Sequence, residues 1–362
     1  MEIQTWDKFD AVDTFNNNKL VGRICREHGD TYGSLYIEQV NSRKAEQLIY
    51  CVPKLHYPFD KNDNWHFPKA IKIERYEKLD GTSIFQYRYT DSNNRSYITY
   101  KTRLLPVLGN SRFGPFLDMW QEILRLNPDI ATLPDKLNMN LAYELWGARN
   151  PHLIKYEVSL VASLLFARSV NGLLPPSLIA QNIARTADFR GLVNTEYIEA
   201  YKSVQSEINA TLRENDDKTI SGSEGEVWYL QDEFKNWSLI KCKPELIEAI
   251  HFSSGGIPKN TIWSTCENAL ENWDDPTVEN IYQLLLEEFT ADKVEKAFYS
   301  IKAILEEVKV NHVIVENVMY EYKKQGLNVL TERNDTMRGL SKILDKDSMR
   351  KAYAIIVSHI ST

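Results

Sequence analysis

The alternation of hydrophobic and polar positions divides the chain into two parts. Between Lys19 and about Lys243, short runs rich in Tyr, Ile, Val and Thr are separated by Asn, Asp, Gly and Ser, a pattern typical of strands and turns. It predicts strands at 33–40, 47–52, 83–90, 96–102, 226–231 and 237–243. Helical spacing interrupts them at 113–127, from Pro176 onward and at 194–215. Together these elements predict an α+β fold with mostly antiparallel strands.

Beyond about residue 256 the strand pattern fades. Apolar residues recur at helical spacing in four segments, at 275–289, 291–308, 310–326 and 345–360. The third segment stops at Gly326, a residue typical of helix ends. A chain of 362 residues is long enough for about two domains. We therefore predict an α+β domain over 1–255 and an all-α domain over 256–362.

Composition and charge narrow the protein class. Hydrophobic residues make up 43% and charged residues 26%, as in a globular protein, and no apolar run approaches the length of a membrane span. The start "MEIQTWDKFD" lacks the features of a signal peptide, and the four cysteines form no CxxC pair, which predicts a cytoplasmic protein without a zinc site or disulfide framework. The net charge of −7 argues against a protein that coats nucleic acid, but it allows a small basic channel.

The stretch "YEKLDGTSIF" contains the first candidate for chemistry. Its lysine, Lys78, lies two residues before Asp80 and three before Gly81. Taken alone, this spacing is typical of a charged surface hairpin, because Asp-Gly favours a tight turn. It also fits a lysine that forms a covalent bond, so the rest of the chain has to distinguish the two.

Two acidic positions and a lysine pair extend the pattern. Glu144 lies in the apolar run "LAYELWG", where a carboxylate is costly to bury without a partner, and an ion pair with Arg149 is one alternative. Glu224 precedes a glycine and a strand-forming run. Strand alternation places the side chains of Lys241 and Lys243 on one face, where two ammonium groups require an anion between or opposite them.

In this order, the motifs resemble those of the covalent nucleotidyltransferase superfamily, which comprises ATP-dependent DNA ligases, RNA ligases and mRNA capping enzymes. Lys78–Gly81 match motif I, Tyr143–Glu144 motif III, Glu224–Gly225 motif IV and Lys241–Lys243 motif V. The resemblance covers about residues 40 to 245. Each motif is weak singly, but the ordered set is specific.

Within the superfamily the chain is most similar to phage-type RNA ligases. Ser83 stands where DNA ligases and capping enzymes usually carry an arginine, and the segment after Lys243 is helical, without the strand series of an OB-fold. The alternatives are a DNA nick-sealing ligase, a capping-type guanylyltransferase and a non-catalytic nucleic-acid-binding protein of the same fold.

The resemblance implies a fold, a reaction and partners. The fold would be an antiparallel-sheet, ATP-grasp-like nucleotidyltransferase domain followed by a helical RNA-specificity module. The reaction would link AMP from ATP to a lysine, transfer it to an RNA 5′-phosphate, and join that end to a 3′-hydroxyl with release of AMP. The cofactors would be ATP and Mg²⁺ or Mn²⁺. The partner would be RNA, no membrane association is expected, and a monomer is favoured.

The resemblance also assigns the residues that hold the nucleotide's phosphates. Lys78 would be the nucleophile. A free lysine, with a pKa of about 10.4, is protonated near neutral pH, and nearby positive charge and desolvation lower this pKa. Lys241 and Lys243 would supply that charge and hold the α-phosphate. Glu77 and Gly81, on either side of Lys78 in the chain, are assigned to nucleotide binding.

Three acids receive roles on the same basis. Asp80 would position the nucleophile, the nucleoside or a metal-bound water, and a turn-capping role is compatible with this. Glu144 would bind the ribose hydroxyls. Glu224 would hold the divalent metal, because carboxylate oxygens suit Mg²⁺, and Glu226 is a less favoured substitute.

The remaining assignments concern the base and the substrate ends. Phe166, in the predicted strand 159–169, would stack on adenine, with a core phenylalanine as the alternative. Arg103 resembles the motif Ia arginine, and Arg112 is its rival. Lys54 would hold the outgoing pyrophosphate.

Overall fold

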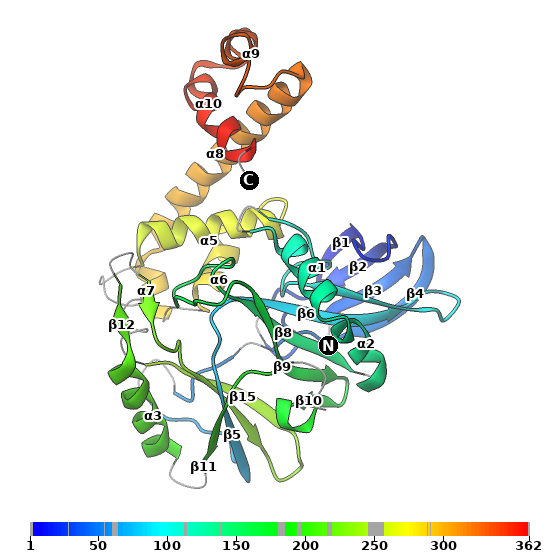
Figure 1. The fold of residues 1–362 in the computed structure, drawn as a ribbon, viewed down its shortest axis with the longest axis vertical. Helices are drawn as coiled ribbons and strands as arrows, with labels where there is room; N and C mark the ends of the chain where they lie inside the picture. Colours follow the sequence, from blue (N-terminus) through cyan, green and yellow to red (C-terminus); the bar gives the residue numbers. More distant parts are fainter. Residues whose placement is uncertain are drawn as a thin grey trace. The chain divides into compact units, whose positions relative to one another are not determined.

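The chain forms two compact units, Met1–Ser253 and Ser254–Thr362. The computed structural model describes residues 3–27, 29–53, 55–59, 64–111, 114–137, 139–179, 185–193, 197–215, 219–244, 257–287, 289 and 291–360. The ladders between the named strands are antiparallel, and helices make up the second unit over its described residues (Figure 1). The predicted fold class, antiparallel α+β followed by a helical region, is confirmed.

Over its described residues, the first unit contains three main sheets. The N-terminal sheet has the order β1–β2–β3–β4, with β1 (Asp7–Val12), β2 (Lys19–Ile24), β3 (Leu35–Val40) and β4 (Arg43–Ile49). The second has the order β10–β9–β8–β6–β7, with β6 (Thr82–Thr90), β7 (Ser96–Lys101), β8 (Asn140–Trp146), β9 (Val161–Ser169) and β10 (Gly172–Leu174). The third has the order β11–β5–β14–β15, with β5 (Lys72–Glu77), β11 (Phe189–Val193), β14 (Glu226–Gln231) and β15 (Trp237–Cys242). A small ladder joins β12 (Arg213–Glu214) to β13 (Ile220–Ser221).

One apolar core lies between the second and third sheets. It combines Phe85 and Phe166 of the second sheet with Tyr76 and Tyr229 of the third, and it also takes in buried residues of the N-terminal sheet. The hydroxyl of Tyr229 donates a hydrogen bond to the Leu165 carbonyl, 2.9 Å away, so the two sheets are also joined by a polar contact. Any side chain at the rim of this core can face both sheets.

Helices cover the outer faces of both sheets. Trp120 of α1 (Phe116–Leu126) and Leu133 of α2 (Asp129–Leu137) pack with buried residues of the second sheet. Tyr201 of α3 (Tyr197–Thr211) packs with Trp228 of the third sheet. A short 3₁₀ helix, η1 (Ile3–Thr5), precedes β1. The order of layers is therefore helix, sheet, core, sheet, helix.

The structure differs from the sequence prediction after Pro176. Here the described chain forms only the single 3₁₀ turn η2 (Pro176–Leu178), because Ile179 has extended dihedral angles of −100° and 140°. The predicted helix is therefore wrong at its start, and residues 180–184 lie outside the described part of the chain.

Six helices are described in the second unit. They are α5 (Lys259–Asn272), α6 (Val278–Leu285), α7 (Ala291–Lys296), α8 (Phe298–Gln325), α9 (Arg333–Leu340) and α10 (Lys346–Ile360). Thr277 caps α6 by accepting a hydrogen bond from the Asn280 backbone N–H. The helix stop predicted at Gly326 is confirmed, because this residue caps α8 with a φ of 65°.

The long helix α8 organises the second unit. The helices α5, α6 and α7 lie beside its N-terminal part, and α9 and α10 lie beside its C-terminal part (Figure 1). Val318 of α8, Leu340 of α9 and Ile356 of α10 belong to one buried cluster. Among the described helices, none combines the length and apolarity needed to cross a membrane.

Candidate active site

The segment from Lys78 to Gly81 crosses from one sheet to the other. It leaves β5 of the third sheet and enters β6 of the second, so it is not a hairpin between paired strands. The backbone N–H of Lys78 donates to the Gly225 carbonyl at 2.8 Å, and Ser83 lies opposite Glu144 in the β6–β8 register. The surface-hairpin alternative for this motif is therefore wrong.

Two glycines allow the backbones at the crossing to approach closely. A Cβ atom on Gly81 would lie 2.3 Å from the Leu145 carbonyl oxygen. One on Gly225, whose φ of +148° already disfavours other residues, would lie 2.2 Å from the Cys242 carbonyl oxygen. The lack of a Cβ atom at both motif glycines therefore allows the backbones to approach. This approach brings Lys78, Glu224 and the end of β15 together.

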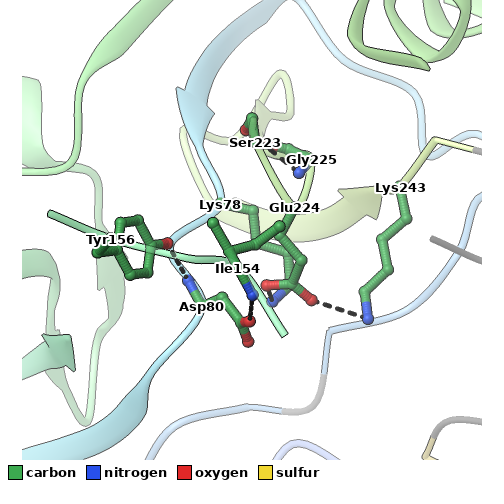
Figure 2. A network of polar contacts seen from close by, with 8 residues as sticks. All are labelled: Lys78, Asp80, Ile154, Tyr156, Ser223, Glu224, Gly225 and Lys243. Carbon is green, nitrogen blue, oxygen red and sulfur yellow. Dashed lines mark hydrogen bonds and ion pairs between the residues drawn. The ribbon is translucent and has the colours of Figure 1, made fainter. Parts of the chain in front are cut away.

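A buried carboxylate joins the two lysines that the sequence placed 165 positions apart (Figure 2). Glu224 Oε2 lies 2.5 Å from Lys78 Nζ, and Glu224 Oε1 lies 2.9 Å from Lys243 Nζ. Glu224 is 5% exposed and Lys243 is 3% exposed. Glu224 is therefore an anion for Lys243, one of the two lysines that the sequence placed on one strand face, and it also pairs with Lys78.

Opposing effects set the ionisation of Glu224. Burial by itself would raise the pKa of its carboxyl, but the ammonium groups of Lys78 and Lys243 outweigh burial and hold the pKa below its usual range. Glu224 is thus an anion held between two cations.

Lys241 lies in β15, two residues before Lys243. It is 6% exposed, and its Nζ lies 4.4 Å from the centre of the Tyr57 ring, over which it forms a cation–π contact. Although β15 is the last strand of the third sheet, the ammonium groups of Lys241 and Lys243 are held inside the unit and not in solvent. Buried ammonium groups of this kind favour an anionic ligand.

Glu144 is the second acid of the site. Arg149 does not pair with it, because Arg149 Nη1 lies 2.8 Å from both carboxylate oxygens of Glu122. Burial raises the pKa of Glu144 to about 8, and the carboxylates of Glu224 and Asp80 add to this rise. Glu144 therefore carries a proton near neutral pH.

A hydroxyl group lies on the strand beside Glu144. Ser83 is its register partner, and the buried Oγ of Ser83 has no hydrogen-bond partner within the described residues. A buried hydroxyl without a partner is costly, so a ligand that bonds to it would gain from the contact. Ser83 and Glu144 together present polar groups suited to a ligand's hydroxyls.

The raised pKa of Glu144 predicts a pH-dependent stability. Since the unfolded carboxyl loses its proton near 4.5 and the folded one near 8, Glu144 destabilises the fold progressively as the pH rises between these values. Glu144→Gln removes this effect. Its melting temperature, compared with that of the wild type, is expected to gain at least about 4 °C between pH 5 and pH 8, the scale of 1–2 kcal/mol. A difference that stays constant across this range, measured by thermal unfolding, contradicts the assignment.

Asp80 fixes the motif I segment to a neighbouring loop. One of its oxygens, Oδ2, accepts a hydrogen bond from the Ile154 N–H at 2.7 Å, and its own N–H donates to the Tyr156 hydroxyl at 2.9 Å (Figure 2). Burial raises the pKa of Asp80, and the Glu224 carboxylate raises it further. Asp80 thus holds Lys78 in place through the backbone, while lying close enough to Glu224 to interact with it electrostatically.

Other predicted site residues lie outside the ion-paired cluster that Lys78, Glu224 and Lys243 form. Glu77 pairs with Arg190 at 3.0 Å, and burial raises its pKa. Phe166 is 3% exposed and packs in the apolar core, so little of its ring is accessible for stacking. Lys54 and Arg112 lie outside the described residues.

Arg103 lies beside the N-terminal sheet. Its guanidinium carbon is 5.4 Å from the centre of the Tyr32 ring. Its charge also acts on Glu144, where it opposes the rise in pKa. Arg103 is therefore within electrostatic reach of the site, but it does not belong to the ion-paired cluster.

Sequence reasoning missed the contacts of two tyrosines. Tyr57 lies under the ammonium group of Lys241, and Tyr156 holds Asp80. Both come from segments without a regular hydrophobic pattern. The nearest signal was the aromatic run around Tyr57, "HYPF", which follows Lys54.

The side chains at the site limit the kind of metal site that they could form. Among the described residues, no group of three or more His, Cys, Asp and Glu side chains could hold a metal ion. Glu224 offers carboxylate oxygens, and Mg²⁺ commonly binds through one or two carboxylates together with water and substrate phosphates. The residues fit a metal ion that binds with a phosphate ligand, and they do not form an all-protein metal site.

Comparisons with known proteins give distant structural likenesses. No family model and no curated protein matches the chain. An archaeal ATP-dependent RNA ligase is 13% identical over 86% of this chain and 76% of its own, with a TM-score of 0.46. A proposed ATP-dependent DNA ligase from Aquifex aeolicus is 15% identical over 88% and 78%, with a TM-score of 0.45. The Naegleria gruberi RNA ligase, as a mutant with ATP and Mn, is 18% identical over 49% and 50%, with a TM-score of 0.35. At this distance a likeness does not specify a function, and the residues of the site have to do so.

Proposed function

We propose that this protein is an ATP-dependent RNA ligase that joins 5′-phosphate and 3′-hydroxyl ends through a lysyl-AMP intermediate. The observation that carries the proposal is the buried carboxylate of Glu224, held between Lys78 and Lys243, with the buried Lys241 two residues before Lys243. An arrangement that buries Lys241 and Lys243 and holds Lys78 against the carboxylate of Glu224 is costly as a purely structural device. It is suited to a polyphosphate, whose negative charge these lysines can bind.

In the first step, the amine nitrogen of Lys78 attacks the α-phosphorus of ATP. A phosphorus–nitrogen bond forms, the bond between the α-phosphorus and the bridging oxygen breaks, and pyrophosphate leaves. Lys78 gives up one proton before the attack and one after it. The ammonium groups of Lys241 and Lys243 stabilise the negative charge on the non-bridging oxygens.

The acids of the site complete this step. Glu144, protonated near neutral pH, and the hydroxyl of Ser83 bind the ribose hydroxyls. Asp80 keeps Lys78 in line through two hydrogen bonds: its Oδ2 accepts from the Ile154 N–H, and its own N–H donates to the Tyr156 hydroxyl. Glu224 would hold Mg²⁺ or Mn²⁺, which would neutralise charge on the triphosphate. Lys78 must leave its ion pair with Glu224 before it attacks.

The later steps use the same phosphate-binding groups. The 5′-phosphate of RNA displaces Lys78 from the AMP phosphorus, which restores the lysine and leaves an adenylylated RNA end. A 3′-hydroxyl then attacks the RNA phosphorus and releases AMP. Both are displacements at phosphorus, so Lys241 and Lys243 again face the developing charge.

The direct test combines labelling with end joining. Incubation with α-labelled ATP and Mg²⁺ should give a labelled protein that survives denaturation, whereas labelled GTP should not label it. Joining should be faster with RNA strands than with DNA strands. Labelling by GTP would indicate a capping-type enzyme, faster DNA joining a DNA ligase, and the absence of label with either nucleotide a non-catalytic protein.

The separate roles of the two units give a further prediction. We propose that residues 1–255 carry adenylyltransfer and that residues 256–362 select the RNA. A protein truncated after residue 255 should still label with ATP, because the described site residues precede this point. It should join RNA ends at least about 10-fold more slowly, because aligning two ends for in-line attack needs contacts beyond the nucleotide pocket. Joining at the full-length rate, with folding checked by circular dichroism, would contradict a recognition role for the second unit.

A further inference from the structure

The positive charge of the second unit is concentrated at its C-terminal end. Residues 254–332 contain seven Lys and Arg against fourteen Asp and Glu. Residues 333–362 reverse this balance, with six basic residues against three acidic ones, Asp335, Asp345 and Asp347. A segment of net positive charge attracts a polyanion, whereas the net negative charge of residues 254–332 repels it.

The basic end contains a hollow at the start of α10. Its volume is about 540 Å³, and it is lined by Ser341, Leu344, Lys346, Met349 and Arg350. Lys346 and Arg350 are four residues apart on α10, so their side chains lie on the same face of the helix. Two cations and a hydroxyl therefore border a hollow large enough for a nucleotide phosphate group and its sugar.

Asp345, directly before α10, caps the start of this helix. Asp345 accepts hydrogen bonds from the Ser348 N–H at 3.0 Å and from the Ser348 hydroxyl at 2.6 Å. Its carboxylate is thereby tied to the first turn of α10. Because the Ser348 N–H is already bonded to Asp345, an anion in the hollow would bind through the cationic side chains of Lys346 and Arg350.

The basic face continues along α10. Tyr353 follows Arg350 by three residues, and the guanidinium carbon of Arg333 lies 4.0 Å from the centre of the Tyr353 ring. Tyr353 packs against the buried cluster of this end, so it fixes the position of Arg333 at the surface. From Lys346 to Tyr353 the helix rises by about 10 Å, over which a nucleic acid strand carries more than one phosphate.

We propose that this end of the second unit binds the phosphate backbone of the RNA substrate, with Lys346 and Arg350 as direct contacts and Arg333 as a third. The inference rests on the proposed ligase function for the identity of the occupant. RNA is the polyanion that the reaction brings to the protein, and the charge reversal along the unit selects this end for it. Backbone contacts of this kind position a strand without reading its sequence.

The experiment compares two double variants with the same change in charge. Lys346→Glu/Arg350→Glu alters the hollow, whereas Lys259→Glu/Lys302→Glu alters two exposed lysines in the acidic part of the same unit. Binding of a fluorescein-labelled single-stranded RNA of about 20 nucleotides is measured by anisotropy between about 50 and 200 mM salt. Self-labelling with α-labelled ATP is measured in parallel without RNA.

The hollow variant is expected to bind RNA at least about 10-fold more weakly than the control variant, since each phosphate contact has a sizeable effect. Its log affinity should depend less on log salt, by about 1.4 in slope, the value for two lost phosphate contacts on a single strand. Labelling with ATP should equal that of the wild type. Equal affinity and slope in the two variants would overturn the inference. A wild type that binds RNA at this end but never labels with ATP would leave the phosphate contacts standing and overturn the ligase function instead.

Discussion

Lys78→Ala is expected to abolish covalent labelling of the protein by α-labelled ATP. Neither of the other two described lysines of the site is placed to replace the Lys78 nitrogen, because Lys243 Nζ lies on the opposite oxygen of Glu224 and Lys241 Nζ lies over the Tyr57 ring. The loss should therefore be complete to the detection limit, and end joining from ATP should be lost with it. Denaturing gels after incubation with label and Mg²⁺ measure this directly.

Lys78→Arg is the informative companion variant. It keeps a cation beside Glu224, so the ion pair and the fold are retained, but a guanidinium stays protonated and cannot attack. It should therefore remain unlabelled. Lys44→Ala, at an exposed lysine of β4, serves as the control and should label like the wild type. Label that persists in Lys78→Ala, or that maps to another lysine by peptide mass, would show that the nucleophile has been misassigned.

If labelling depends on Lys78, joining of pre-adenylylated RNA by Lys78→Ala separates the steps. Only the first two steps form or break a bond to Lys78. The variant should therefore still join an RNA end that already carries AMP, although it cannot activate one. Failure on both substrates would indicate that Lys78 also supports the site structurally through its bond to Glu224.

Strand alternation was sufficient to predict the inward side of β15. A period of two places Lys241 and Lys243 together, and two buried cations imply an anion nearby. The sequence could not name that anion. The contact between Lys78 and Glu224 depends on the pairing of β5 with β14, in which Glu77 lies opposite Glu226, and residues 146 positions apart have no shared local pattern.

In the long helix α8, by contrast, the hydrophobic pattern gave a wrong prediction of where helices end. Its first half buries Ile301, Ile304 and Val308, whereas Val310 and Val313 are 60% and 54% exposed. Because these valines do not continue the buried stripe, the hydrophobic pattern predicted two helices, at 291–308 and 310–326. The structure has one helix from Phe298 to Gln325 that carries exposed valines, and the break lies earlier, at Ala297. No Gly or Pro occurs between these ends to stop the helix.

The adenine contact illustrates why a residue type is a weak guide. Phe166 lies on β9 as the strand pattern predicted, but a buried aromatic residue at that spacing serves the core equally well. Its 3% exposure follows from the approach of the second and third sheets, which is a tertiary feature. Charged residues are better predictors here, since burying them demands a partner and an apolar ring demands none.

Removing either partner of the buried ion pair is expected to lower labelling by ATP by at least about 100-fold, the scale for one preorganised charged group at a reacting centre. Glu224→Ala and Lys243→Ala should share this loss of activity. Their stabilities should differ. Without Glu224, the buried ammonium group of Lys243 and the partly buried one of Lys78 lose this carboxylate, which should cost about 3–5 kcal/mol, whereas without Lys243 the carboxylate keeps Lys78 as a partner.

Glu226→Gln provides the matched control, because Glu226 is also a buried carboxylate, two residues after Glu224 at the start of β14. It contacts Arg75 at 3.5 Å and accepts a hydrogen bond from Trp228 Nε1 at 3.0 Å, away from the lysines. It should therefore keep labelling within about 10-fold of the wild type, below the scale of a catalytic charge. Thermal unfolding and labelling of all three variants test the scheme together. If the Glu224→Ala/Lys243→Ala double variant labels normally, or if Glu226→Gln loses as much activity as Glu224→Ala, the ion-paired cluster is not the centre of the reaction.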